Sequence, residues 1–211
     1  MGVAERKERH KEELKKDILM AAKQLFMEKG YEATSIRNIA EKIEYSPATV
    51  YLYYRDKDEI MHAIHSEGFK MLVSHFAPLG TIADPFERLK GLGHAYIRFC
   101  LENAEMYNLL FVMHDPMDHV AHCKEDWDEG DRAFDVLYNT VVDCQQKGYL
   151  QNVEPYGLSF MIWSTMHGLC TLRTSGHLGH VSSFKNVQPD VDSLMTYTYE
   201  TFVKVLELLK Q

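Results

Sequence analysis

The amino-acid sequence predicts an all-α protein of about nine helices. Apolar residues recur at intervals of three and four along most of the chain, which is the period of a helix with one buried face. No segment of any length alternates apolar and polar residues as a half-buried strand does. Glycine, proline and short polar residues interrupt the pattern where helices can begin and end. These observations favour helices joined by short connections.

The N-terminal part of the chain predicts three helices in a compact unit. Its first helix ends at Gly30, and a stripe of apolar residues marks the buried face. That stripe consists of Leu14, Ile18, Ala21, Leu25 and Phe26. Ser35 can cap a second helix over residues 36–43. Pro47 at a first helical position begins a third helix, which runs to about Tyr54.

The rest of the chain predicts longer helices. Asp56 and Glu59 resemble a capping box for a helix that ends near Phe76. The further helices are expected over residues 85–102, 103–113, 127–147, 155–174 and 189–209. A polar loop is expected over residues 115–126. Glycines inside the expected helices allow either bending or close packing, and these are Gly68, Gly91 and Gly93.

The charge is divided unequally along the chain, whose net charge is −8. Residues 1–57 carry 12 Lys and Arg against 10 Asp and Glu, a net charge of +2, and residues 58–211 carry 11 against 21, a net charge of −10. A mildly basic part can approach phosphate while an acidic part stays away from it. The opposite charge balances suggest different partners, so we expect two domains, one over 1–57 and one over 58–211.

The sequence predicts a cytoplasmic protein without a membrane span. No apolar stretch follows the basic N-terminal residues, as a signal peptide would require. The least charged segment, residues 155–172, has 10 apolar residues of 18, whereas a spanning helix needs about 20 mostly apolar residues. The cysteines are far apart in the sequence, as expected for reduced thiols, and they are Cys100, Cys123, Cys144 and Cys170.

Three short segments carry small, hydroxyl-bearing, aromatic and basic side chains in a fixed order and at fixed offsets. They read TSIRNIA at residues 34–40, YSPATVYLYY at 45–54 and KDEI at 57–60. This pattern resembles the DNA-binding signature of the TetR family of transcription regulators, and the likeness extends from about residue 12 to 70. The resemblance implies a helix-turn-helix that binds double-stranded operator DNA, followed by a helical domain that binds a small-molecule effector and forms a homodimer.

The first residues of the third helix are expected to read bases. A helix in the major groove brings its N-terminal residues to the base edges. Pro47 and Ala48 offer apolar surface to a thymine methyl group, while the hydroxyls of Ser46 and Tyr51 can reach polar edges. Arg37, one helix earlier, can pair bidentately with guanine.

Other side chains are expected at the phosphates, where they fix register without reading sequence. The expected DNA contacts together are Ser35, Arg37, Ser46, Pro47, Ala48, Thr49, Tyr51, Tyr53 and Lys57. The alternative is that the tyrosines are core residues. Helical spacing places Val50 and Tyr54 toward the core and Tyr51 outward. It does not decide whether Tyr53 is a core residue or a DNA contact.

One position departs from the family pattern. The family often has glycine in the turn before the recognition helix, and here Glu44 occupies that position. If the turn requires a positive φ, a non-glycine residue there is strained by about 1 kcal/mol or more.

The C-terminal part predicts an effector pocket. Trp163, His167 and Gly168 are similar to the Trp-His-Gly pattern that names one type of TetR C-terminal domain. Aromatic and methionine side chains can line an apolar pocket, although such residues at helical spacing also form ordinary core. The expected pocket residues are Tyr96, Phe99, Phe111, Met113, Phe134, Tyr138, Met161, Met166 and His167.

Neither a metal site nor an enzyme is predicted. Residues 114–123 contain His114, Asp115, His119, His122 and Cys123, but their spacing matches no zinc pattern and also suits a polar loop. The sequence has no GxSxG, P-loop or HExxH motif, and no cofactor is expected. Two functions stay open: an effector-responsive regulator, most simply a repressor, and a DNA-bound architectural or division-control protein of the same fold.

A homodimer is also expected from the last two long helices. Residues 155–172 are uncharged, and the last helix has two neighbouring apolar faces. One face contains Leu194, Thr198, Thr201, Val205 and Leu208. The other contains Met195, Phe202, Leu206 and Leu209. One core-facing stripe accounts for a single face, so the second is expected to pack on a partner in a four-helix interface.

Overall fold

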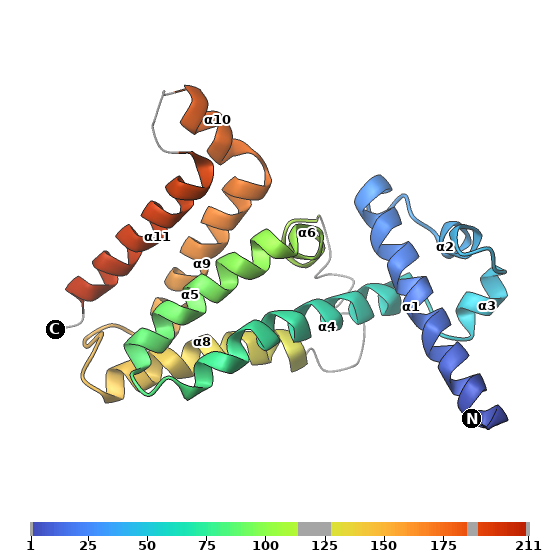
Figure 1. Ribbon diagram of the computed structural model, residues 1–211, viewed down its shortest axis with the longest axis horizontal. Coiled ribbons are helices and arrows are strands. Elements are labelled where there is room, and N and C mark those ends of the chain that lie inside the picture. Colours follow the sequence, from blue (N-terminus) through green and yellow to red (C-terminus); the bar gives the residue numbers. More distant parts are fainter. Residues whose placement is uncertain (1, 114–127, 185–189, 210–211) are drawn as a thin grey trace. The chain divides into compact units, whose positions relative to one another are not determined.

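The computed structural model describes residues 2–113, 128–184 and 190–209, which are helical throughout most of their length (Figure 1). Within these ranges there are ten α-helices, one 3-10 helix and no strand, so the all-α prediction is confirmed. The N-terminal helices are α1 (Val3–Lys29), α2 (Ile36–Lys42), α3 (Pro47–Tyr51) and α4 (Lys57–Phe76). They are followed by η1 (Ala77–Thr81), α5 (Pro85–Glu102), α6 (Ala104–Phe111), α8 (Asp128–Gln146), α9 (Pro155–Thr174), α10 (His177–Phe184) and α11 (Val191–Leu208).

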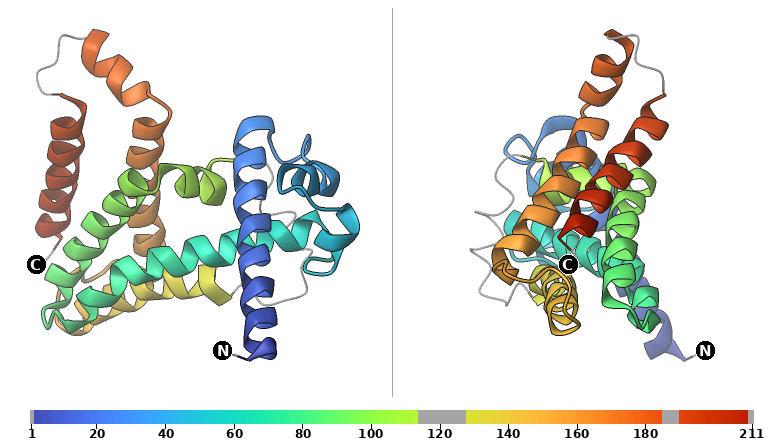
Figure 2. Two further views of the ribbon diagram at one scale, coloured as in Figure 1. Left: turned by 45° about the vertical axis from the view of Figure 1, so that its right-hand side comes forward. Right: turned by 90° about the vertical axis from the view of Figure 1, so that its left-hand side faces the viewer.

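The helix ends differ from the prediction at a few positions. The third helix stops at Tyr51, before the expected Tyr54. Asn103 was expected to begin the next helix, which instead begins at Ala104. The side-chain amide of Asn103 donates to the carbonyl of Phe99 at 3.2 Å, so it binds the end of α5. Helix α10 was not expected, because Gly176 and Gly179 suggested a break in the chain. Figure 2 shows this short helix between α9 and α11. No helix in the described ranges has the length and apolarity needed to cross a membrane.

The chain divides into two compact units. The first contains residues 1–69 and 105–128, and the second contains residues 70–104 and 129–211. Helix α4 contributes its residues up to Phe69 to the first unit and its last residues to the second. The expected domain boundary at residue 57 stays a prediction.

The first unit has a continuous apolar core. The buried side chains come from α1, α2, α3 and α4, and they include Ile18, Phe26, Ile39, Val50, Ile60 and Ile64. Thr34 connects the end of α1 to α2, since its hydroxyl donates to the carbonyl of Gly30 at 2.8 Å. Lys23 on α1 and Glu67 on α4 form an ion pair of 2.7 Å. The core and these contacts hold α2 and α3 in place.

The second unit is built on α5, α8, α9 and α11. Its central cluster consists of Phe86, Leu89, Val141, Cys144, Leu150, Leu158, Ile162 and Leu206. Asp84 caps α5 by accepting from the backbone N–H groups of Phe86 and Glu87. The same carboxylate is 2.7 Å from the ammonium of Lys147, and these contacts hold the pKa of Asp84 well below its usual range. The start of α5 is thereby tied to the end of α8.

Two of the internal glycines allow close packing. A Cβ atom at Gly68 would lie 2.7 Å from the Met106 sulfur, so α4 and α6 approach closely in the first unit. A Cβ atom at Gly93 would lie 2.6 Å from the ring of Tyr199, which brings α5 against α11 in the second unit. Both glycines therefore serve helix–helix contact.

Candidate DNA-binding surface

Serine side chains begin both helices of the helix-turn-helix. The hydroxyl of Ser35 accepts from the backbone N–H of Asn38 at 3.2 Å, and the Asn38 side-chain oxygen accepts from the backbone N–H of Ser35. Ser46 caps α3 in the same way, because its hydroxyl accepts from the backbone N–H of Thr49 at 3.2 Å. The Ser46 and Thr49 hydroxyls are also 2.9 Å apart. These polar side chains set the start of each helix.

The turn between α2 and α3 has the strained residue that the sequence suggested. Glu44 has φ 61°, a conformation that favours glycine. The backbone N–H of Tyr45 donates to the carbonyl of Ala40 at 2.9 Å, and that of Glu44 donates to Glu41 at 3.1 Å. These two bonds form a Schellman motif, in which the residue at the Glu44 position is usually glycine. The sequence left open whether this turn requires a positive φ, and the structure has one at Glu44.

Glu44→Gly is expected to raise the free energy of unfolding by about 0.5–1 kcal/mol, because it relieves left-handed strain at an exposed position. Glu41→Gly is the matched control, since it removes the same charge from an exposed site inside α2. That change should lower stability by about 1 kcal/mol. Urea denaturation of both variants measures the difference. Equal destabilisation by the two substitutions would show that Glu44 is not strained.

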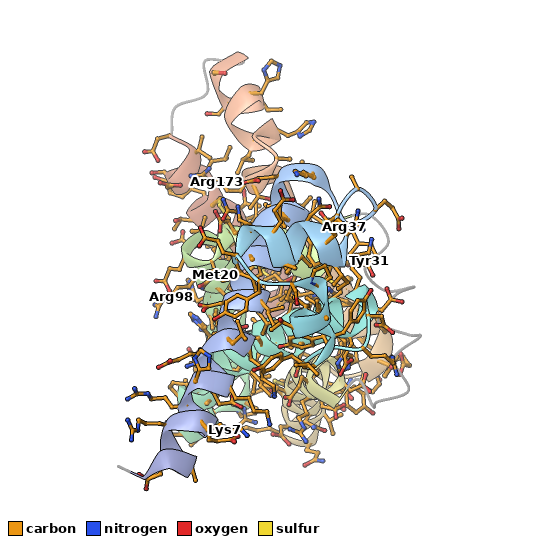
Figure 3. All side chains as sticks on the ribbon, turned by 90° about the vertical axis from the view of Figure 1, so that its right-hand side faces the viewer. Lys7, Met20, Tyr31, Arg37, Arg98 and Arg173 are labelled. Atoms are coloured by element: carbon orange, nitrogen blue, oxygen red, sulfur yellow. The ribbon has the colours of Figure 1, made fainter. Side chains whose placement is uncertain are left out.

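The residues expected to read bases are exposed on the first unit. Arg37, Ser46, Pro47, Ala48 and Tyr51 are all exposed, and 56% of the Tyr51 surface is accessible. Figure 3 labels Arg37 on α2. These side chains are available to a ligand, and their contact with DNA stays a prediction.

The tyrosines of this segment have different environments. Val50 and Tyr54 are buried, as their spacing predicted. Tyr53 and Thr49 are half-buried. The prediction missed two exposed apolar neighbours, Tyr45 and Leu52, of which Leu52 is 81% exposed. Their positions beside Ser46 and Tyr51 in the sequence were the available signal.

Lys57 has a structural role that the sequence did not suggest. Its ammonium donates to the backbone carbonyl of Tyr31 at 2.7 Å and lies 3.9 Å from the centre of the Tyr31 ring. Burial lowers the pKa of Lys57, although Glu32 and Asp58 act in the opposite direction. The Tyr31 hydroxyl donates to the carboxylate of Asp58. Lys57 therefore helps to fix the start of α4 against the end of α1.

The second unit contains a row of aromatic side chains along α8 and α9. Phe134 lies within about 6 Å, ring centre to ring centre, of Tyr156, Phe160 and Trp163. Trp163 is followed on α9 by His167, with ring centres 6.3 Å apart. Phe160 is 44% exposed, so the row reaches the surface of the unit. Spacings of three and four residues along α9 were the sequence signal for this row.

Polar contacts connect this row to α5. The hydroxyl of Tyr96 is 3.3 Å from Nδ1 of His167, and it accepts from the indole N–H of Trp163 at 3.4 Å. Burial lowers the pKa of His167 below its ordinary value, so the neutral imidazole is favoured. An apolar surface with a few convergent polar groups is typical of small-molecule sites.

The predicted pocket residues have several different placements. Tyr96, Phe99 and Met166 are buried in the second unit. Phe134, Tyr138 and His167 are half-buried there, while Met161 is exposed. Phe111 and Met113 belong to the first unit. A narrow crevice between α5, α9 and α11 is lined by Met166 with Phe86, Gly93, Ile162, Tyr199 and Phe202. The effector pocket therefore stays a prediction.

The residues that were considered as metal ligands lie outside the described ranges. His114, Asp115, His119, His122 and Cys123 all lie within residues 114–127. In the ranges that the structure describes, no group of three or more His, Cys, Asp or Glu side chains is placed to hold a metal ion.

The helix-turn-helix and the helical second unit define a class of DNA-binding transcription regulators. Residues 18–64 match the family of bacterial regulatory proteins called the tetR family, and residues 89–198 match the tetracyclin repressor-like C-terminal domain. The chain belongs to the TetR family of transcriptional regulators. This finding confirms the resemblance seen in the sequence, while the Trp-His-Gly subtype stays a prediction.

Curated relatives match part of the chain. It is 32% identical over 94 residues to the transcriptional regulator HbdR of Aromatoleum sp., covering 42% of this chain and 35% of the relative. It is 28% identical over 102 residues to the transcriptional activator FasR of Mycolicibacterium smegmatis, covering 48% and 47%. The alignments thus span less than half the length of these relatives.

Solved structures with the same fold cover most of the chain. The fatty acid degradation regulator FadR from Bacillus halodurans is 17% identical, with a TM-score of 0.68 over 90% of this chain and 94% of that one. FadR from Bacillus subtilis in complex with stearoyl-CoA is 15% identical, with a TM-score of 0.67 over 89% and 96%. AibR in complex with isovaleryl coenzyme A and operator DNA is 17% identical, with a TM-score of 0.65 over 90% and 96%.

Proposed function

We propose that the protein is a repressor that binds a palindromic operator through the α2–α3 surface and leaves it when a small molecule binds the second unit. The exposed set of Arg37, Ser46, Pro47, Ala48 and Tyr51 carries this proposal. The set combines a guanidinium, two hydroxyl-bearing side chains and apolar surface on one short helix and its predecessor. These are the groups that recognise guanine, polar base edges and thymine methyl groups in a major groove.

Arg37→Ala and Tyr51→Ala are each expected to weaken binding to the preferred operator by about 1–3 kcal/mol and to relax base preference at one position per half-site. Arg98→Ala is the matched control, because Arg98 is an exposed arginine on α5 in the second unit. It removes the same charge and should leave sequence preference unchanged. Fluorescence anisotropy with operator variants measures both effects at one salt concentration. Normal binding by both α2–α3 variants would contradict the proposed surface.

Lys57→Met is expected to behave differently from the base-reading variants. It should lower the stability of the first unit, because the bond to the Tyr31 carbonyl and the contact with the Tyr31 ring are lost. Any phosphate contact by Lys57 would appear as a reduction of about one unit in the salt slope of binding.

We propose an acyl-coenzyme A or a related apolar molecule with a polar head as the effector. Two neighbours of the same fold are described in complex with stearoyl-CoA and with isovaleryl coenzyme A. The aromatic row of α8 and α9 supports the proposal from this chain, because it offers an apolar surface beside the Tyr96 and His167 polar groups.

Operator selection from random DNA, followed by addition of acyl-CoA species of increasing chain length, tests the proposed function. Selection of a palindrome and its release by one range of chain lengths supports it. Binding at many dispersed genomic sites with no change in expression, and no release by any ligand, would instead favour an architectural protein. Coenzyme A alone is the control for the apolar part of the ligand.

A two-fold dimer through α9 and α11 is part of the proposal. On α11, Met195, Tyr199 and Leu206 are buried, while Val205 and Leu208 are exposed. One predicted face is thus buried at Met195 and Leu206 but 39% exposed at Leu209, and the other is exposed at Val205 and Leu208. On α9, the outward side is also uncharged, and it contains Met161, Ser164, Gly168 and Leu172. Together they form the outward α9–α11 face, which suits a second copy of the chain.

The dimer provides a route from effector to operator. The two helix-turn-helix motifs of a dimer bind adjacent half-sites only when their recognition helices are about 34–36 Å apart. Helix α4 belongs to both units, so we propose that an effector acts on operator binding through it. The coupling must be reciprocal: an effector that weakens operator binding tenfold binds tenfold more weakly to the DNA complex, about 1.4 kcal/mol.

A further inference from the structure

A leucine at the end of α3 points away from the core of the first unit. Leu52 is 81% exposed, which is the highest exposed fraction of any large apolar side chain in the described ranges. It is the C-cap residue of α3 and follows Tyr51, which is 56% exposed. A single exposed leucine is common in folded proteins. The position of Leu52 relative to the other residues of α3 is what gives its exposure a function.

The helical backbone continues through Leu52. Its φ is −73° and its ψ is −16°, and its backbone N–H donates to the carbonyl of Thr49 at 3.2 Å. Because residues four apart share one face of a helix, Leu52 lies on the same face as the exposed Ala48. Val50 and Tyr54, which are buried, occupy the opposite face. Ala48 and Leu52 thus form the outward stripe of α3.

The outward side of α3 is mainly hydrocarbon. Residues 47–52 contain no charged side chain. The hydroxyl of Ser46 accepts from the backbone N–H of Thr49 and lies 2.9 Å from the Thr49 hydroxyl, so both side chains are engaged at the start of the helix. The hydroxyl of Tyr51 is the remaining polar group of residues 47–52. In a major groove, the hydrocarbon group that a base presents is the methyl group of thymine.

The neighbours of the outward stripe favour DNA as the partner that covers it. Arg37 on α2 and Tyr51 on α3 are exposed and belong to the same unit. Residues 1–57 carry a net charge of +2, whereas residues 58–211 carry −10. The positive charge attracts a phosphate backbone, while the uncharged stripe suits a hydrocarbon group within that partner.

We propose that Leu52 is a specificity-determining residue that contacts a thymine methyl group in the operator. This inference rests on the proposed operator binding, and it adds a residue that the sequence did not indicate. Four helical residues advance about 6 Å, and one base step about 3.4 Å. The thymine that Leu52 reads therefore lies no more than about two base steps from the base that Ala48 reads.

The test removes the methyl group from the DNA and leaves the base pair unchanged. Uracil keeps every hydrogen-bonding group of thymine and lacks only the methyl group. Each thymine of the selected operator is replaced by uracil in both half-sites, one position at a time. Fluorescence anisotropy at one salt concentration then gives the dissociation constant of the full chain. At the position that Leu52 reads, affinity is expected to fall about tenfold, because two methyl contacts are lost.

Leu52→Ala is expected to lose this one sensitivity. At that position its dissociation constants for thymine and uracil should agree within about twofold, while the other thymines keep their wild-type ratios. Leu101→Ala is the matched control, because Leu101 is an exposed leucine on α5 in the second unit. It should keep every thymine-to-uracil ratio. Leu52→Gln, which also removes the apolar end of the side chain, replaces the alanine variant if that does not fold.

Other outcomes would overturn the proposal. A selected half-site without thymine, or a wild-type chain that binds uracil as tightly as thymine, would show that no methyl group is read. Weaker binding by Leu52→Ala with unchanged thymine-to-uracil ratios would give Leu52 a structural role and assign the methyl contacts to other residues. These results leave operator binding intact and refute only the role of Leu52. Failure to select any operator would contradict the proposed function itself.

Discussion

A Gly168→Arg variant is expected to be a monomer at micromolar concentration, with the dissociation constant of the proposed dimer raised about 1,000-fold or more. A Cβ atom at Gly168 meets nothing within 4 Å in one chain, so the substitution fits the isolated subunit. Across a two-fold interface the same position appears on both helices. Two arginines would then be buried without partners, which is costly enough to prevent association.

The neighbours of Gly168 explain why the effect should be large. Met161 and Leu172, seven residues before and four residues after it on α9, are 46% and 47% exposed. The outward face of α11 adds Val205 and Leu208. A glycine among such residues permits close approach of two helices. Because both half-sites of an operator must be engaged together, the monomer is also expected to lose operator affinity.

Gly80→Arg is the matched control for this prediction. Gly80 is exposed in η1, and a Cβ atom there also meets nothing within 4 Å. It adds the same charge away from the outward α9–α11 face. Light scattering and sedimentation velocity measure the assembly of each variant. If Gly168→Arg remained a dimer while folded, the interface would have to lie elsewhere.

The stability of the first unit is expected to fall by about 3 kcal/mol between pH 6.5 and pH 4. Burial lowers the pKa of His65 from 6.5 to about 4, and the nearby charge of His62 acts in the same direction. The Leu109 backbone opposes this shift, but neither ring nitrogen makes a hydrogen bond within the described residues. As pH falls through this window, the unfolded chain binds a proton that the folded chain does not, so unfolding becomes easier.

His65→Leu is expected to remove most of this slope. At pH 7 it should be neutral or stabilising, because it replaces two buried polar atoms without partners by an apolar group of similar volume. His10→Leu is the control, since His10 lies in the exposed N-terminal part of α1. Urea denaturation at pH 4.5, 5.5 and 7, at one protein concentration, gives the slopes. An unchanged slope in the His65 variant would mean that other groups cause the acid sensitivity.

The sequence predicted those features that depend on local geometry. Helical spacing separated the buried Val50 and Tyr54 from the exposed Tyr51. The family pattern marked Glu44 as a position where glycine is frequent, and the structure has a positive φ there. Cap residues such as Ser35 and Ser46 marked helix starts, since their hydroxyls bind backbone groups only three residues away.

Features that depend on distant residues were not predictable in the same way. The contact of Lys57 with Tyr31 spans 26 residues, and periodicity says nothing about it. Gly68 and Gly93 were ambiguous, because bending and close packing require the same missing side chain. The close approach of Met106 to Gly68 and of Tyr199 to Gly93 shows that both glycines serve packing, and both contacting residues belong to other helices. The assignment of Phe111 to the first unit, when most other expected pocket residues belong to the second, likewise depends on contacts between residues distant in the sequence.

The contacts of Trp163 give the protein an optical reporter. The indole N–H bonds to the Tyr96 hydroxyl, and the ring is a neighbour of Phe134, Phe160 and His167. Indole emission shifts with the polarity around the ring, and a protonated imidazole quenches it. In a chain with two tryptophans, a Trp127→Phe substitution leaves Trp163 as the sole indole fluorophore. Its emission wavelength and lifetime then follow events at the α8–α9 surface without any added dye.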